Sequence, residues 1–98
     1  MAPITDEQVE AVRALVARIP AGRVSTYGDI ADAAGLSSPR IVGWIMRTDS
    51  SDLPWHRVIT ASGRPAAHLA TRQLELLRAE GVLADDGRVR LAEVRHSF

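Results

Sequence analysis

The sequence has 98 residues, of which 46% are hydrophobic and 24% are charged, with no net charge and no cysteine. A chain of this length is expected to fold as one domain, over residues 1–98. Its composition is typical of a folded globular protein and excludes disulfides, a thiolate metal site and a cysteine nucleophile. The three histidines, His56, His68 and His96, are too scattered to predict a metal site, and no cofactor is expected.

The sequence gives no sign of a membrane segment. Its uncharged stretches fall far short of the roughly 18–20 apolar residues that span a bilayer. The N-terminus, Met1-Ala2-Pro3-Ile4-Thr5-Asp6-Glu7, has no basic segment followed by an apolar one. We therefore expect a cytoplasmic protein without a membrane partner.

Positive charge comes from arginine alone and is concentrated in the middle of the chain. Residues 36–74 carry five arginines and two acidic residues, whereas both flanking parts are net negative. A basic stripe in a neutral chain permits a small nucleic-acid contact, although it argues against strong non-specific binding to a polyanion. A solvated surface would explain the same stripe.

Three helices are predicted in the first half of the chain, each with a recognisable start and stop. Thr5 and Thr26 each begin a capping box, Gly35 is a C-terminal glycine, and Pro39 takes the favoured first helical position after Ser38. The helices are expected over residues 5–19, 26–34 and 39–47. Two short helices around a glycine-containing turn are typical of a helix-turn-helix, although αα-hairpins that do not bind DNA share this pattern.

The sequence of the second half of the chain predicts less regular structure. Residues 48–56 resemble a loop and residues 57–60 a brief strand, followed by a helix from about Ala67 to Glu80 with Leu74 and Leu77 facing inward. Asp86-Gly87, between short apolar runs, is a strong hairpin signal. The sequence therefore predicts a mainly α fold: a single winged helix-turn-helix-like domain with a short strand and hairpin.

Four separated blocks of sequence resemble the C-terminal, DNA-binding and active-site domain of the O6-alkylguanine-DNA alkyltransferases, over roughly residues 6–91. The blocks are Ile19–Ala31, Arg40–Gly43, Leu53–Ile59, and Arg72-Gln73 with Leu76–Val82. In the third block the alkyltransferases have Pro-Cys-His-Arg-Val, where this chain has Trp55 in place of the cysteine. With tryptophan at that position, the chain resembles the alkyltransferase-like proteins. These proteins bind alkylated guanine in DNA without repairing it and flag the lesion for nucleotide excision repair.

The resemblance and the chemistry agree that no alkyl transfer is expected. Removing the alkyl group from guanine requires a soft nucleophile, and the indole of Trp55 is not one at neutral pH. In the family, the histidine and glutamate that match His56 and Glu80 help to activate the thiol. We interpret this pair as structural remnants, with no catalytic residue in the chain.

The resemblance also implies which residues contact DNA. It implies that Tyr27 displaces the phosphate 3′ of the lesion and that Arg40 enters the stack where the flipped base was, although from the residues alone both could be ordinary packing and surface positions. The third helix is expected in the minor groove, which small residues such as Gly43 permit. Trp44 departs from the family; it could stack on a sugar, pack in the core or face a partner, and we favour a contact near DNA.

The lesion pocket is expected to be formed by residues around the third block. The segment Gly63–Thr71 is shorter than the corresponding pocket loop of most relatives, so its lesion-contacting residue is either Arg64 or His68, with Arg64 the better candidate. Pro54, Trp55 and Val58 complete the predicted pocket. Ile45 and Met46 are interpreted as core residues. Solvated surface or hairpin charges are expected at Arg13, Arg18, Arg88, Arg90 and Arg95.

The predicted function is that of a non-enzymatic damage sensor that binds O6-alkylguanine in double-stranded DNA by nucleotide flipping. Expected partners are lesion-containing DNA and nucleotide excision repair proteins, and we expect a monomer. A winged-helix transcription factor is the alternative, but its recognition helix would be rich in Arg, Asn and Gln, whereas residues 39–47 offer Arg40 and Arg47. An alkyltransferase with another nucleophile is the third possibility, and the chain has neither cysteine nor lysine for it.

Overall fold

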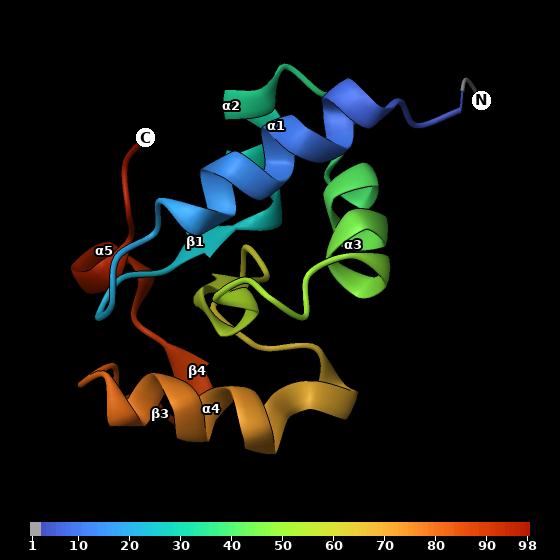
Figure 1. Cartoon of the computed structure of the whole chain (residues 1–98). Helices are drawn as coiled ribbons and strands as arrows, with labels where there is room; N and C mark the ends of the chain where they lie inside the picture. Colours follow the sequence, from blue (N-terminus) through green and yellow to red (C-terminus); the bar gives the residue numbers. More distant parts are fainter. Residues whose placement is uncertain (1–2) are drawn as a thin grey trace.

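The computed structural model describes residues 3–98; residues 1 and 2, which open the predicted 1–98 domain, lie outside it. Helices α1 (Asp6–Ala17), α2 (Tyr27–Ala34) and α3 (Pro39–Thr48) pack against one another at one end of the molecule (Figure 1). Helix α4 (Ala70–Ala79) lies at the opposite end. The predicted mainly α fold and its helix-turn-helix, α2 and α3, are confirmed.

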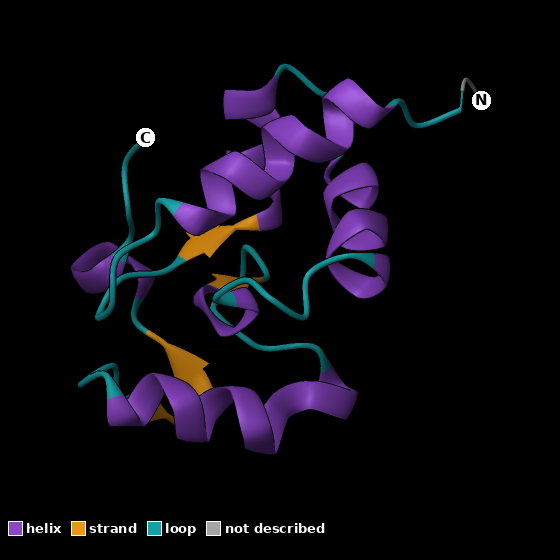
Figure 2. Ribbon diagram, in the orientation of Figure 1, coloured by secondary structure: helices purple, strands orange, loops and turns teal. Residues whose placement is uncertain are grey.

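Short strands and turns complete the fold (Figure 2). Strand β1 (Ser25–Thr26) pairs in parallel with β2 (Val58–Ile59), and strands β3 (Ala84–Asp85) and β4 (Arg88–Val89) form an antiparallel hairpin. The remaining elements are the 3-10 turns η1 (Trp55–Arg57) and η2 (Ala67–Leu69) and the short helix α5 (Leu91–Val94). The strand near residues 57–60 was predicted from the sequence, whereas its pairing with β1 and helix α5 were not.

The capping residues explain where the helices begin. At the start of α1, Thr5 Oγ1 accepts from the backbone N–H of Gln8 at 3.1 Å, and Gln8 Oε1 accepts from the backbone N–H of Thr5 at 3.0 Å. This is the predicted capping box. At α2 only half of the second box forms: Thr26 Oγ1 accepts from the backbone N–H of Asp29 at 3.0 Å.

The carboxylate of Asp29 has a stronger partner than the backbone. Arg95 donates to it from Nε at 2.7 Å and from Nη2 at 2.8 Å, and these hydrogen bonds lower the pKa of Asp29. A guanidinium gives two hydrogen bonds in which both partners are charged, whereas the Thr26 backbone would give one from an uncharged donor. Arg95 is exposed, as expected of a solvated charge, and in addition its pair with Asp29 joins the C-terminal segment to α2.

The turns follow the sequence signals. Gly35 ends α2 with a φ of +70°, a conformation that favours glycine, and Ser38 Oγ accepts from the backbone N–H of Arg40 at the start of α3. Asp86 and Gly87 both have positive φ, +52° and +75°, as a two-residue type I′ hairpin requires. Within residues 3–98, none of the helices combines the length and apolar character needed to cross a membrane.

Two hydrophobic clusters share strand β2. The first lies among α1, α2 and α3, and the second lies against α4 and the hairpin. Val58 belongs to the first cluster and Ile59 to the second, because successive side chains of a strand point to opposite faces. Ile45 and Met46 are buried in the first cluster, as expected, and Leu77 is buried in the second with Leu74 packed against it.

Candidate functional site

A cavity of about 710 Å³ lies between α3, η1 and the segment that leads from η2 into α4. It brings together residues that are far apart in the sequence. Of the predicted site residues it includes seven, namely Tyr27, Arg40, Gly43, Trp44, Trp55, Val58 and His68. The other lining residues are Met46, Arg47, Thr48, Ser50, Ser51, Ala66, Leu69 and Gln73.

Helix α3 presents one side to this cavity. Arg40, Gly43, Trp44 and Arg47 lie three or four residues apart along the helix, so they share a face, and all four line the cavity. Trp44 is 46% exposed and is therefore not a core residue. Among the described residues, neither Arg40 nor Arg47 forms an ion pair with a carboxylate.

Gly43 lies in the middle of this helix without an internal reason for being glycine. A Cβ placed on it would meet nothing within 4 Å, and its φ is not positive. Glycine in a helix interior is destabilising by about 1 kcal/mol relative to alanine. The packing of the described residues therefore does not require a small residue at this position of the cavity lining.

Trp55 forms part of the cavity wall in η1. Its indole is half-buried, packs against the first hydrophobic cluster and meets the ring of His56 edge-on, with ring centroids 6.2 Å apart. Tyr27, at the first turn of α2, is also half-buried, and this burial raises the pKa of its hydroxyl. Because the phenol stays protonated at neutral pH, it can donate a hydrogen bond.

The carboxylate of Glu80 accepts hydrogen bonds from two parts of the chain, the turn η1 and the backbone at Gly22. His56 Nε2 lies 2.7 Å from Glu80 Oε2, and Arg57 approaches both carboxylate oxygens through Nε, at 3.0 and 3.1 Å, and Oε2 through Nη2, at 2.7 Å. The backbone N–H of Gly22 donates to Oε1 at 3.1 Å.

These donors decide the protonation state of Glu80. Burial alone would raise the pKa of this carboxyl, but the hydrogen bonds from Arg57, His56 and Gly22 outweigh burial and lower the pKa to about 2. The carboxylate is therefore ionised at neutral pH, and His56 Nε2 carries the proton in their hydrogen bond. His56 and Glu80 do hydrogen-bond to each other, and neither is among the residues that line the cavity.

Sequence reasoning missed two residues that hold this region together. Arg57 also donates from Nη1 to the backbone O of Ile19 at 2.9 Å, which connects η1 to the end of α1. Gln73 is 2% exposed, and its Nε2 donates to the backbone O of His56 at 2.9 Å and of Val58 at 2.7 Å. The signal for Gln73 was its place four residues before buried Leu77, on the inward face of α4.

Two of the residues predicted for the pocket, Arg64 and Pro54, lie outside the cavity lining. Arg64 Nη1 donates to the backbone O of Asp86 at 3.1 Å, so its guanidinium lies at the hairpin and is not among the cavity lining, and Pro54 does not line the cavity either. His68 is exposed in η2 and lines the cavity. Arg90 pairs with Asp85 and Glu93 at the surface.

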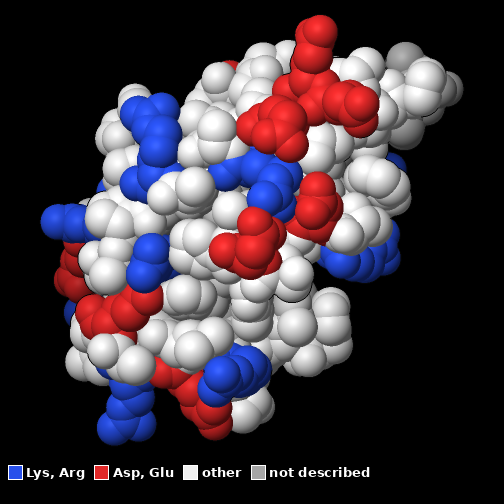
Figure 3. All heavy atoms as spheres, viewed as in Figure 1, with Lys and Arg blue, Asp and Glu red and all other residues white. Residues whose placement is uncertain are grey.

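Charge around the cavity is of one sign. Its lining includes Arg40, Arg47 and His68 and contains no carboxylate. By contrast, the face drawn in Figure 3 carries acidic and basic side chains mixed together, as expected for a chain without net charge. The arrangement suits contact between the cavity rim and an anion of limited extent, since an excess of basic over acidic groups is found at the cavity and not over the face in Figure 3.

Comparison with known proteins finds relatives that all belong to one family. The family described as "6-O-methylguanine DNA methyltransferase, DNA binding domain" matches residues 7–82. The chain is 39% identical over 92 residues to the DNA base-flipping protein of Escherichia coli (strain K12), covering 86% of this chain and 70% of that protein. It is 40% identical over 84 residues to Alkyltransferase-like protein 1 of Schizosaccharomyces pombe, covering 79% of this chain and 78% of that protein.

Solved structures agree with the sequence relatives. The crystal structure of S. pombe Atl1 in complex with damaged DNA containing O6-carboxymethylguanine matches with a TM-score of 0.83 and 32% identity, covering 98% of this chain and all of that one. Mycobacterium tuberculosis OGT in complex with DNA matches with a TM-score of 0.67 and 33% identity, over 80% of this chain and 51% of that one. The chain belongs to the family of the 6-O-methylguanine DNA methyltransferase DNA-binding domain, and its fold is that of the alkyltransferase-like proteins.

Proposed function

We propose that this protein is a non-enzymatic sensor of DNA damage, which binds O6-alkylguanine in duplex DNA by turning the nucleotide into the cavity beside α3. The observation that carries the proposal is the position of Trp55, which lines the cavity where the alkyltransferase motif has its nucleophile. The similarity to Atl1, solved with DNA containing O6-carboxymethylguanine, supports the choice of ligand. The whole of residues 1–98 would act as one DNA-binding domain.

Alkyl transfer is not part of this function. The chain has no cysteine, and the indole of Trp55 does not act as a soft nucleophile at neutral pH. His56 and Glu80 hydrogen-bond to each other, and Arg57 also binds Glu80, so the three side chains form one network beside Trp55. We therefore propose that His56 and Glu80 keep the cavity wall in place and that the alkyl group stays on the DNA.

The DNA contacts come from the exposed side of α3. Arg40, which forms no ion pair with a carboxylate of residues 3–98, has a permanently charged, planar side chain, which can enter the base stack in place of a flipped nucleotide. The open space at Gly43 allows the DNA backbone to approach the helix closely, and Trp44 lies one residue further on the same face, where it would contact a sugar or base. Tyr27 would contact the phosphate that rotates as the nucleotide leaves the stack.

The lesion contacts come from the opposite wall. Trp55 and Val58 would pack against the extruded base and its alkyl group, with Pro54 fixing the start of the turn that carries Trp55. Of the two candidates in the short segment 63–71, we now favour His68, since it lines the cavity while Arg64 is held at the hairpin by Asp86. Unstacking a base costs a few kcal/mol, which these contacts and Arg40 would offset.

We further propose that the protein acts as a monomer in the cytoplasm and that the distorted site is recognised by nucleotide excision repair proteins. A small domain that marks a lesion without removing it needs a second activity to complete the repair. The Arg40 side of α3 would be covered by DNA in the complex, so repair proteins would approach from the opposite side.

The test is competition binding between a duplex that contains one O6-methylguanine and its unmodified twin, at a stated salt concentration because phosphate contacts make affinity salt-dependent. We expect a clear preference for the lesion duplex, with the methyl group still on guanine after incubation and no increase in the mass of the protein. Recovery of unmodified guanine, or methylated protein, would show that the chain is an enzyme. Equal affinity for both duplexes, with a preference for one base sequence, would favour a transcription factor.

A further inference from the structure

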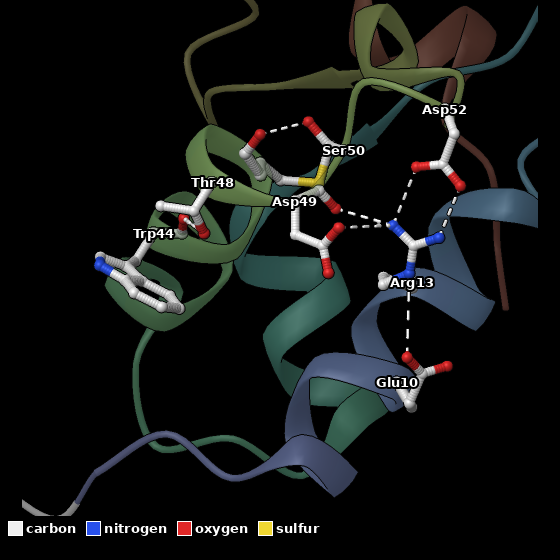
Figure 4. A network of polar contacts seen from close by, with 8 residues as sticks. Glu10, Arg13, Trp44, Thr48, Asp49, Ser50 and Asp52 are labelled. Atoms are coloured by element: carbon white, nitrogen blue, oxygen red, sulfur yellow. Dashed lines mark hydrogen bonds and ion pairs between the residues drawn. The ribbon is translucent and has the colours of Figure 1, made fainter.

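Arg13, in the middle of α1, reaches across to the loop that follows α3 (Figure 4). Its Nη1 donates to the backbone O of Asp49 at 2.8 Å and to Asp49 Oδ1 at 3.3 Å. Nη1 and Nη2 together hold the carboxylate of Asp52, at 3.0 Å from Oδ1 and 2.6 Å from Oδ2. The expectation that Arg13 is a solvated charge was wrong, because one guanidinium binds three groups of this loop.

The loop held by Arg13 is also a wall of the cavity. It runs from Asp49, the C-cap of α3, to Pro54 before η1, and so it joins the helix that carries Arg40 to the turn that carries Trp55. Ser50 and Ser51 line the cavity, and Asp49 and Asp52 bracket them in the sequence. The loop therefore has one side toward the cavity and its two flanking carboxylates toward α1.

Internal hydrogen bonds make this loop a compact unit. The Ser50 hydroxyl donates to the backbone O of Met46, the backbone N–H of Leu53 donates to the backbone O of Ser50 at 2.9 Å, and the backbone N–H of Trp55 donates to the backbone O of Leu53 at 2.7 Å. A displacement at Asp52 would therefore be passed along to Trp55, since two consecutive turns connect them. Arg13 fixes this unit to α1 at both of its acidic residues.

Arg13 is not placed to touch DNA itself. Figure 4 shows Trp44 on the side of α3 that faces away from Arg13, and Arg13 is not among the residues that line the cavity. The Arg13 side chain is only 20% exposed, whereas Asp49 and Asp52 are 56% and 61% exposed. Ion pairs with such exposed carboxylates contribute little to stability on average. The planar fork of the guanidinium, which binds Asp52 through two nitrogens, instead defines a geometry.

We propose that Arg13 is a positioning residue for the lesion cavity: by fixing Asp49 and Asp52 against α1, it sets the separation between α3 and Trp55. This inference rests on the proposed function. Arg13 then controls how well the cavity fits an extruded base without contacting it, because the wall Ser50–Ser51 and the start of η1 move with the loop. Its loss widens the range of loop positions and weakens binding of the lesion more than binding of undamaged DNA.

The experiment uses the full chain with Arg13→Gln, which keeps much of the length and loses the charge and the fork. Arg90→Gln is the matched control, since Arg90 also pairs with two carboxylates but lies at the hairpin, away from the cavity. Hydrogen exchange is followed at the amides of Leu53 and Trp55, and binding is measured with an O6-methylguanine duplex and its unmodified twin. Arg13→Lys tests whether charge alone is sufficient.

For Arg13→Gln we expect about tenfold faster exchange at the two loop amides with unchanged protection in α4, because the loop opens locally. We also expect about three- to tenfold weaker binding of the lesion duplex, with binding of the undamaged twin within about twofold. Arg13→Lys should recover only part of this loss, and Arg90→Gln should behave as wild type.

Unchanged loop exchange in Arg13→Gln, or an equal loss of affinity for both duplexes, would overturn the positioning role. If Arg13→Gln does not fold, the variant Asp52→Asn is used instead. It removes the charged partner of Arg13 at the exposed Asp52, and the same changes in loop exchange and lesion affinity are expected for it. A wild-type protein that does not prefer the lesion duplex overturns the proposed function instead, and the exchange rates then decide by themselves whether Arg13 orders the loop.

Discussion

Arg57 and Glu80 form a two-sided ion pair, with Arg57 Nε 3.0 Å from Glu80 Oε1 and Arg57 Nη2 2.7 Å from Glu80 Oε2. Their backbones lie in different parts of the fold, because Arg57 ends η1 and Glu80 is the C-cap of α4. Arg57 also holds the backbone O of Ile19. One arginine and one carboxylate therefore connect the end of α1, the turn η1 that contains Trp55, and the end of α4.

This pair predicts a specific acid sensitivity. The pKa of Glu80 falls from an ordinary value of 4.5 to about 2 in the folded protein, so the folded state binds this proton less readily than the unfolded state. The stability that Glu80 contributes is therefore fully present above about pH 4.5 and is lost as the pH falls toward 2. Urea unfolding followed by circular dichroism should show the free energy of unfolding decreasing across this window.

Glu80→Gln should lower the free energy of unfolding at pH 7 by about 1–3 kcal/mol and flatten its pH dependence between pH 4.5 and 2. The control is Glu93→Gln, whose carboxylate is 65% exposed and lies 3.7 Å from Arg90. The control should change stability by less than about 0.5 kcal/mol. A Glu80→Gln protein with the same acid profile as wild type would show that another carboxyl causes the loss.

Gln73 provides a test that does not involve charge. Gln73→Met fills a similar volume but removes the amide that donates to the backbone O of His56 and of Val58. Leaving buried carbonyls without a donor should destabilise the protein by about 1–3 kcal/mol. Thermal unfolding measures this loss, and Arg72→Met, at an exposed neighbouring position of α4, should leave stability nearly unchanged. Equal stability of both variants would mean that the two carbonyls find other donors.

For Arg40 we predict a loss of lesion recognition without a loss of stability. Arg40→Ala should weaken binding of an O6-methylguanine duplex by about 1–3 kcal/mol, as expected for an arginine that acts on the base stack rather than on one phosphate. Arg88→Ala is the matched control, because Arg88 is exposed on the hairpin and does not line the cavity. Fluorescence anisotropy with labelled duplexes gives both affinities. Small and equal losses would identify Arg40 as an ordinary surface charge.

Two variants of Trp55 test separately how the shape of the cavity and the missing nucleophile affect function. Trp55→Ala should reduce affinity chiefly for alkylated DNA, because burial of apolar surface contributes about 25 cal/mol per Å². Trp55→Cys restores the Pro-Cys-His-Arg-Val string next to His56, yet we expect little or no alkyl transfer. A cavity formed around an indole leaves the smaller sulfur beyond the roughly 3–3.5 Å that attack requires. Robust alkylation of this variant, detected by mass spectrometry, would show that only the sulfur is missing.

Local signals in the sequence predicted most of the helix ends and the hairpin. The capping box at Thr5, the left-handed turn at Gly35 and the type I′ turn at Asp86-Gly87 each depend on residues within four positions of one another. Such interactions can be read from the sequence because the partners are adjacent in it. The same logic failed at Asp29, where a distant arginine displaced the local partner.

Long-range contacts could not be predicted in the same way. The bond between Arg13 and Asp52 joins residues 39 positions apart, and each residue alone has the appearance of a surface charge. Gln73 acts on backbone oxygens, which carry no sequence signature. The cavity was predictable only through the resemblance, which named Tyr27 and Trp55. The position of His68 at the cavity and of Arg64 at the hairpin depends on long-range contacts and was not predictable from the sequence.

The alternation of Val58 and Ile59 between the two hydrophobic clusters bears on how the protein unfolds. Molecules with two clusters often open in two steps, one cooperative unit at a time. Here a single two-residue strand supplies a buried side chain to each cluster and pairs with β1, which directly precedes α2. Neither cluster can come apart without disturbing β2. Thermal unfolding should therefore be one transition, with the amides of β2 exchanging only when the whole chain unfolds.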